Sequence, residues 1–314
     1  MRRFFLTVLL IFAICVSACS TTETRKGEMQ GTIRISGAFA LYPMVVKWAE
    51  EFNKIYPDVR IDISAGGAGK GAADALAGLV DLGMISREIS PEEVAQGAVY
   101  VPVAKDAVFA TMNSNNPAKD EILGKGLNRQ AFIDLWIDGT QLTWGDVAGA
   151  SSSEEVVLYT RSDACGAADT WAIYLGARQE DLKGTGVYAD PGLADAVKND
   201  RLGIGYNNLN YAYDFNTGLP VEGLLVIPID VNENGIVDDN EKVDTKDMAI
   251  EAVSSGSYPS PPARDLYLMT KTEFSGITLE FVKWILTDGK QYLGEAGYIQ
   301  VSQSKLDNAL AQIS

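Results

Sequence analysis

A repeating order of strand and helix signals near the start of the chain constrains its fold most. Strand signals occur at residues 32–36, 59–63 and 80–85, and helix signals lie between them at 45–55 and 68–79. The strands alternate apolar and polar side chains or are apolar throughout, whereas apolar residues of the first helix recur every three to four positions. This β-α-β-α-β order predicts a parallel sheet with helices packed against it.

Three turns follow these strands at their carboxyl ends, where parallel sheets place their ligands. They are Gly37–Leu41, the glycine-rich segment Gly66–Gly71 and the pair Ser86-Arg87. The glycine-rich segment has neither the spacing of a P-loop nor that of a dinucleotide fingerprint. Its glycines are equally consistent with a helix that packs closely on the sheet.

Another strand-to-helix turn, later in the chain, carries a permanent positive charge. Residues 157–161 form an apolar strand that ends in Arg161, and the small residues Cys165, Gly166 and Ala167 precede a stretch with helical spacing. Amides at a helix start lack partners within the helix and carry the positive end of its dipole. Together with a forked guanidinium, they predict an anion site. The alternative is an ordinary turn with a surface arginine.

The N-terminal segment predicts export. Arg2 and Arg3 precede a short apolar run, which is typical of a signal peptide over residues 1–19. The ending Val-Ser-Ala-Cys19 resembles a lipobox, in which the cysteine is acylated and becomes the mature N-terminus. Residues 20–30 are polar and predict a flexible tether. We expect the protein to be anchored by lipid to the cell membrane, on its periplasmic or extracellular face.

Charge and composition exclude several functions. The formal net charge of −16 argues against nucleic acid as a partner. The absence of histidine excludes Ser–His and Cys–His catalysis and histidine-ligated metals. If Cys15 leaves with the signal and Cys19 carries lipid, Cys165 has no disulfide partner.

Residues 230–241 match the spacing of a twelve-residue calcium loop. Oxygen ligands fall at the expected positions and Gly235 occupies the sixth, where the loop must turn. The expected ligands are Asp230, Asn232, Asn234, Asp238 and Glu241 with their side chains, and Ile236 with its carbonyl. We predict a structural Ca²⁺ here, with a solvated acidic turn as the alternative.

Several segments together resemble the phosphate-binding proteins of ABC importers, a branch of the two-lobed periplasmic receptors. The resemblance covers nearly the whole chain after the signal. It is carried by Ser36–Pro43, Gly66–Gly71, Asp81–Arg87, the Phe132–Gly139–Trp144 segment, Tyr159–Gly166, Gly203–Tyr206, Tyr258-Pro259 with Arg264–Tyr267, and Gly297-Tyr298.

The resemblance implies an α/β fold of the type II periplasmic-binding-protein class. Each lobe would be a sheet flanked by helices, and a two-strand hinge near 106–113 and 256–265 would join them. The implied lobe 1 comprises 31–112 and 257–314, and the implied lobe 2 comprises 113–256 with the calcium loop. The implied function is capture of inorganic phosphate between the lobes by a monomeric receptor, for delivery to a membrane permease, without catalysis or a catalytic cofactor.

The resemblance also implies the ligand-binding residues. They are Phe39, Ala40, Leu41, Gly69, Lys70, Ser86, Arg87, Arg161, Asp163, Cys165, Gly166 and Ala167. Here the chain departs from the family, because alanine, phenylalanine or cysteine stands where hydroxyls are expected, at 38, 39, 40, 68, 165 and 167. A receptor for tungstate, molybdate or another oxyanion is therefore the alternative.

One acidic residue of the implied site has an open role, and another acidic residue is expected to cap a helix. Asp163 is a candidate acceptor for the proton of hydrogen phosphate, which would discriminate against sulfate. It could instead pair with Arg161 or cap the following helix. Asp190, which precedes Pro191, is expected to cap a helix that runs to Lys198.

Two other classes of function remain as weaker hypotheses. One is an enzyme with Cys165 as its nucleophile, because a helix start can lower the pKa of a thiol. The other is a calcium-dependent surface protein, which would leave the arginine and the free amides unexplained.

Overall fold

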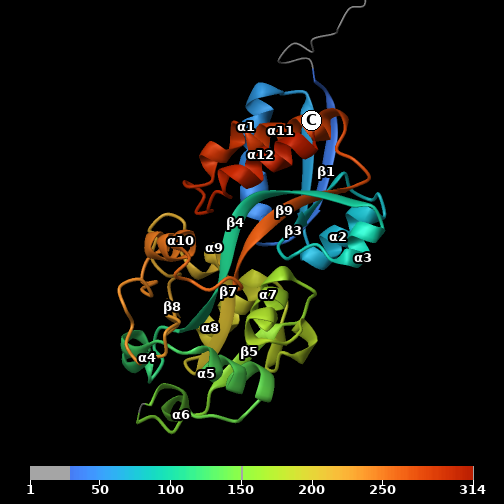
Figure 1. Cartoon of the computed structure of the whole chain (residues 1–314). Helices are drawn as coiled ribbons and strands as arrows, with labels where there is room; N and C mark the ends of the chain where they lie inside the picture. The colour runs from blue at the N-terminus through green and yellow to red at the C-terminus, as the bar shows by residue number, and fades with distance from the viewer. Residues whose placement is uncertain (1–28, 150, 314) are drawn as a thin grey trace, which may run out of the picture.

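Two long strands connect the two lobes of the molecule (Figure 1). Strand β4 (Ala98–Asn113) and strand β9 (Ala263–Lys271) pair antiparallel along most of their length. The computed structural model describes residues 29–149 and 151–313. The predicted signal peptide and the proposed lipidation site Cys19 therefore lie outside the described residues.

Short strands complete the sheet on either side of this central pair. They are β1 (Gly31–Gly37), β2 (Val59–Ala65), β3 (Leu82–Ile85), β5 (Val157–Arg161), β6 (Thr185–Val187), β7 (Gly203–Asn208) and β8 (Leu224–Val226). The order across the sheet is β2-β1-β3-β9-β4-β7-β5-β6, and β8 pairs with β4 off this path.

Helices surround the strands in both lobes. They are α1 (Tyr42–Ile55), α2 (Ala68–Leu76), α3 (Pro91–Ala95), α4 (Lys119–Lys125), α5 (Arg129–Ile133), α6 (Trp144–Ala148), α7 (Gly166–Leu175), α8 (Asp190–Asn199), α9 (Leu209–Ala212), α10 (Lys246–Ser255), α11 (Gly276–Leu286) and α12 (Gln303–Gln312). A π-helical turn (Asp134–Asp138) and two 3₁₀ turns, Gln179–Asp181 and Gly289–Tyr292, complete the inventory.

The prediction of a parallel sheet is right only for part of it. Strand β1 pairs parallel with β2 and β3, and β5 pairs parallel with β6 and β7. The pairs β3–β9, β4–β9, β4–β7 and β4–β8 are antiparallel. The antiparallel part exists because β4 carries the chain into the second lobe and β9 brings it back.

Each lobe has its own hydrophobic core. The core of lobe 1 includes Ile33, Trp48 and Phe281, with α1, α11 and α12 on one side of the strands and α2 and α3 on the other (Figure 1). The core of lobe 2 includes Trp136 and Trp171. Along β4 the residues pass from the first core to the second between Ala104 and Ala107, and along β9 between Leu266 and Ala263. The predicted lobe boundaries at 112 and 257 stay predictions.

Several predicted elements begin or end elsewhere for identifiable reasons. The strand predicted at 80–85 begins at Leu82, because the carboxylate of Asp81 accepts a hydrogen bond from the amide of Arg34 at 2.8 Å. The helix predicted to start near Trp171 begins at Gly166. In the described part of the chain, the helices are too short or too polar to span a membrane.

Close packing of α2 against the sheet gives the first testable prediction. A β-carbon added at Gly71 would lie 2.7 Å from the carbonyl oxygen of Met84 and 2.8 Å from Cα of Gly37, whereas one at Gly124 of α4 would meet nothing within 4 Å. We expect Gly71→Ala to lower the free energy of unfolding by about 1–3 kcal/mol through overpacking. Gly124→Ala should leave it unchanged or raise it by about 0.5–1 kcal/mol. Urea unfolding of both variants measures this, and equal stabilities would contradict the packing.

Candidate functional site

Arg161, at the end of β5, lies at the centre of the predicted anion site. Its side chain has an exposed fraction of 0%. Nε and Nη2 donate to the two carboxylate oxygens of Asp163 at 2.8 and 2.6 Å, and Nη1 donates to Asp190 at 2.7 Å. Burial lowers the pKa of Arg161, but the carboxylates of Asp190 and Asp163 outweigh burial and raise it. The guanidinium therefore keeps its charge in the interior.

The backbone after Arg161 presents free amides. Cys165 is the N-cap of α7, and its Sγ accepts a hydrogen bond from the amide of Ala168 at 3.5 Å. The amides of Gly166 and Ala167 donate to no other residue that the structure describes. Because these groups lie at the positive end of the helix dipole, they are suited to binding an anion.

Two turns of lobe 1 present amides of the same kind. Within residues 29–149 and 151–313, no acceptor is found for the amides of Phe39 and Ala40, or for those of Gly69 and Lys70 at the start of α2. Leu41 differs, because its amide donates to the carbonyl of Ala38 at 3.2 Å. The prediction that Leu41 binds the ligand through its amide is therefore not favoured by the geometry.

Close contacts join these turns across the two lobes. The contacts are the Phe39 ring 5.7 Å from the guanidinium carbon of Arg161, Gly166 against the carbonyl of Ser86, and Gly67 against the carbonyl of Ala164. A β-carbon added at Gly166 would lie only 2.1 Å from the Ser86 oxygen. The lobes are therefore closed, and the predicted turns meet around Arg161.

Two predicted cationic side chains are held in ion pairs within lobe 1. Lys70 forms an ion pair with Asp74, one helical turn along α2. Arg87 forms a two-point ion pair with Glu93, at 2.6 and 2.9 Å. Both carboxylates belong to lobe 1. For Lys70, only the backbone amide remains a candidate ligand donor.

The structure adds three polar residues that the sequence analysis did not place in the site. Asp190 is the first residue of α8 rather than its cap; the N-cap is Ala189, with a φ of 65° and no side-chain cap. Asn208 donates from Nδ2 to Oδ1 of Asp190, and its own Oδ1 accepts from Nη2 of Arg264. These residues lie far apart in the sequence. The Asp190-Pro191 pair was interpreted as a helix start, and Arg264 was noted only as part of a segment that carries the family resemblance.

Arg264 and Asp106 extend this network into the two connecting strands. Nε of Arg264 donates to the carbonyl of Ser86 at 2.7 Å, and Nη2 lies 3.6 Å from Oδ2 of Asp106. Both side chains are buried, with exposed fractions of 4% and 3%. Burial raises the pKa of Asp106 to about 6, although Arg264 lowers it.

The environment of Cys165 contradicts the hypothesis of a nucleophilic thiol. Burial raises the pKa of Cys165 to about 12, and the nearby charge of Arg161 opposes this only in part. At neutral pH the group is therefore a neutral thiol, which is a poor nucleophile.

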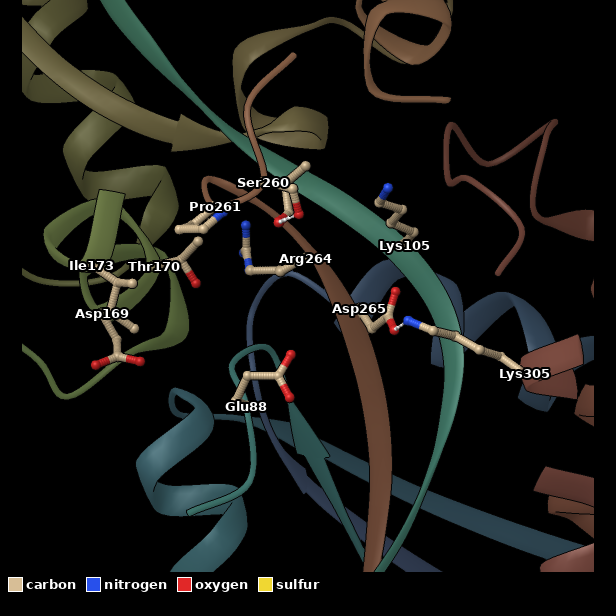
Figure 2. A pocket seen from close by; sticks show the side chains of 11 residues that line it. Glu88, Lys105, Asp169, Thr170, Ile173, Ser260, Pro261, Arg264, Asp265 and Lys305 are labelled. Carbon is tan, nitrogen blue, oxygen red and sulfur yellow. Dashed lines mark hydrogen bonds and ion pairs between the residues drawn. The ribbon is translucent and has the colours of Figure 1, made fainter. Parts of the chain in front are cut away.

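A cavity of about 300 Å³ lies between the lobes beside the connecting strands (Figure 2). Asp169, Thr170 and Ile173 of α7 line one wall, and Glu88 and Asp265 belong to lobe 1. Arg264 also lines this cavity, but none of the ligand-binding residues predicted from the sequence does. The cavity carries charges of both signs, including the ion pair of Asp265 with Lys305.

The predicted calcium loop is closed by its own hydrogen bonds. The two oxygens of Asp230 accept from the amides of Asn234 and Gly235 at 3.1 and 2.8 Å, and Glu241 accepts from the amide of Val231 at 2.8 Å. Gly235 has a φ of 77°, as the turn at the sixth position requires. In the described residues, no group of three or more His, Cys, Asp or Glu side chains is arranged to hold a metal ion. Calcium binding stays a prediction.

The raised pKa of Asp106 predicts a pH dependence of stability. A carboxyl whose pKa is higher in the folded state than its usual value of 3.8 binds its proton more tightly when folded, so stability falls as the pH rises from about 4 to 6. Relative to Asp106→Asn, the wild type should lose on the order of 3 kcal/mol across this interval. Urea unfolding of both proteins between pH 4 and 7 measures the difference. Parallel pH profiles would contradict the assignment.

Comparison with known proteins shows similarity in sequence and in fold. Curated relatives include the phosphate-binding proteins PstS of Staphylococcus epidermidis, 25% identical over 318 residues (96% of this chain and 91% of the relative), and of Bacillus subtilis, 25% identical over 311 residues (95% and 92%). A Clostridium perfringens protein solved with bound phosphate superposes with a TM-score of 0.70 at 22% identity, over 87% of this chain and all of that one. The family model described as "PBP superfamily domain" matches residues 22–289. The chain therefore belongs to the PBP superfamily of solute-binding receptors.

Proposed function

We propose that this protein is the substrate-binding receptor of an ABC importer and captures inorganic phosphate between its two lobes. One observation carries the proposal: Arg161, a fully buried guanidinium, lies beside helix-start amides from both lobes that have no acceptor among the residues the structure describes. Inorganic phosphate matches such a set of donors in size and charge. The printed names of the PstS relatives and the phosphate-bound neighbour point to the same ligand.

Backbone amides near Arg161 bind the anion although the protein as a whole is negatively charged and repels it. In the proposed site, the amides of Phe39, Ala40, Gly69 and Lys70 belong to lobe 1, and those of Gly166 and Ala167 belong to lobe 2. A ligand between them bonds to both lobes at once, so it stabilises the closed arrangement over the open one. Release to the membrane permease then requires the lobes to separate.

The two carboxylates on Arg161 set the preference for a protonated anion. Asp163 and Asp190 together outweigh the charge of Arg161, so a fully ionised guest such as sulfate is disfavoured. Hydrogen phosphate can donate its proton to Oδ2 of Asp163, which accepts a single hydrogen bond, from Arg161, among the residues described here. The scarcity of hydroxyls in the site keeps molybdate and tungstate as the second candidate ligands.

The proposal also covers the export of the protein, its oligomeric state and its attachment to the membrane. We infer that the protein is exported as a monomer and is held at the outer side of the cell membrane by lipid on Cys19. The lipobox-like sequence supports this inference. Mass spectrometry of the purified membrane form would detect the acylated cysteine.

Calorimetric titration tests the proposed ligand. We expect the wild type to bind phosphate and to bind sulfate at least about 100-fold more weakly, because sulfate cannot donate a proton to a buried carboxylate. Arg161→Gln should lower the affinity for phosphate by about 100-fold, whereas Arg201→Gln, which breaks an exposed ion pair in lobe 2, should not. Equal binding of phosphate and sulfate would contradict the preference, and tight binding of molybdate or tungstate alone would replace phosphate as the ligand.

A second variant avoids the destabilisation that the loss of Arg161 could cause. Gly166→Ala keeps every charge but places a carbon 2.1 Å from the Ser86 oxygen, so the lobes cannot close fully. We expect at least a tenfold loss of phosphate affinity with little change in unfolding free energy. The matched control is Gly124→Ala, which meets no atom. Unchanged affinity in Gly166→Ala would show that this contact is not part of the bound state.

A structural Ca²⁺ in residues 230–241 is a further part of the proposal. The buried carboxylates of Asp230 and Glu241, each 6% exposed, support it, together with the ligand spacing. Calcium chloride at millimolar concentration should raise the melting temperature, and magnesium should do so less. Glu241→Gln should abolish the effect, whereas Glu273→Gln, in lobe 1, should not. An unchanged melting temperature in the wild type would leave the loop as an acidic turn.

A further inference from the structure

Arg264 is a buried arginine on a strand that joins the lobes. It lies near the start of β9, and the strand register pairs it with Asp106 of β4. Figure 2 shows it close to Thr170 of α7, with which it lines the cavity described above. A buried guanidinium is costly unless its donors are satisfied, so its partners reveal what it does.

The hydrogen bonds of Arg264 reach both lobes. Nε donates to the carbonyl of Ser86 in lobe 1 at 2.7 Å, and Nη2 donates to Oδ1 of Asn208 in lobe 2. Asn208 in turn donates to Asp190, and Asp190 accepts from Nη1 of Arg161 at 2.7 Å. An unbroken series of polar contacts therefore leads from the proposed anion-binding arginine to the backbone of the opposite lobe.

Asp106 lies next to Arg264 and carries the opposite charge, but the two side chains form no hydrogen bond. The nearest atoms of the two side chains, Nη2 and Oδ2, lie 3.6 Å apart, beyond a hydrogen bond. Oδ2 of Asp106 and Nη1 of Arg264 are both buried, and neither has a hydrogen-bond partner in the described chain. Two opposite charges that are buried side by side without a hydrogen bond indicate that closure has drawn the guanidinium toward Ser86 and Asn208.

We propose that Arg264 is a positioning residue that fastens the closed state, exchanging a hydrogen bond to Asp106 in the open state for those to Ser86 and Asn208. Ser86 and Asn208 belong to different lobes, so opening must remove at least one of these acceptors. Asp106 lies opposite in the strand register and keeps its place beside Arg264. The coupling of this exchange to the anion rests on the proposed function; the exchange itself does not.

Substitution of Arg264 and substitution of Asp106 should change the affinity for phosphate in opposite directions. Arg264→Gln removes the closed-state bonds and should lower phosphate affinity about tenfold or more. Asp106→Asn removes the open-state partner and should raise the affinity several-fold. In the Arg264→Gln background, the Asp106→Asn change should have no such effect, because the exchange no longer exists. Arg201→Gln serves as the control for loss of an arginine charge.

Small-angle X-ray scattering of the anion-free proteins tests the exchange without any ligand. The radius of gyration should be smaller in Asp106→Asn than in the wild type and no smaller in Arg264→Gln. If Arg264 were purely structural, Arg264→Gln would lower the melting temperature, and the radius of gyration of Asp106→Asn would equal that of the wild type. That result would overturn the inference. If the wild type fails to bind phosphate, the proposed function fails, but the scattering still decides whether the exchange occurs.

Discussion

The burial of one guanidinium between two carboxylates is the interaction on which the rest of the structure depends. Arg161 has no exposed side-chain surface, and its bonds to Asp163 and Asp190 fix the ends of two segments, the turn before α7 and the start of α8. The hydroxyl of Tyr206 accepts from the backbone amide of Arg161 at 3.2 Å, and its ring stacks on Trp171 in the core of lobe 2. The guanidinium of Arg161, its backbone amide and the aromatic core of lobe 2 are thus held in place by one connected set of contacts.

This arrangement explains how a protein of net charge −16 could offer the proposed anion site. The donors are backbone amides and a guanidinium that are held in place before a ligand arrives, so little reorganisation is needed on binding. The carboxylates that hold Arg161 in place would, in the proposed site, also weaken its attraction for a fully ionised ligand. In the proposed site, selectivity and architecture would therefore have a common origin in the same three side chains.

Local patterns predicted the parts of the molecule that local physics determines. The strand and helix order of residues 31–87, the turn after Arg161 and the free amides of Gly166 and Ala167 followed from periodicity and small residues. The antiparallel pairing of β4 and β9 did not, because strand direction depends on where the chain returns. Asp190, Asn208 and Arg264 were also missed as site residues, since a polar network among residues 190, 208 and 264 leaves no periodic trace. Asp163 had two open roles, and the structure shows that it pairs with Arg161.

The most direct test of the central claim is a crystal structure of the exported chain grown with tungstate and, separately, with phosphate. The account predicts an anomalous tungsten peak, and a phosphate at the same position, within hydrogen-bond reach of the Arg161 guanidinium and of the amides of Gly166 and Ala167. An anion found only on the outer surface, with Arg161 still enclosed by its two carboxylates and no room beside it, would contradict the account.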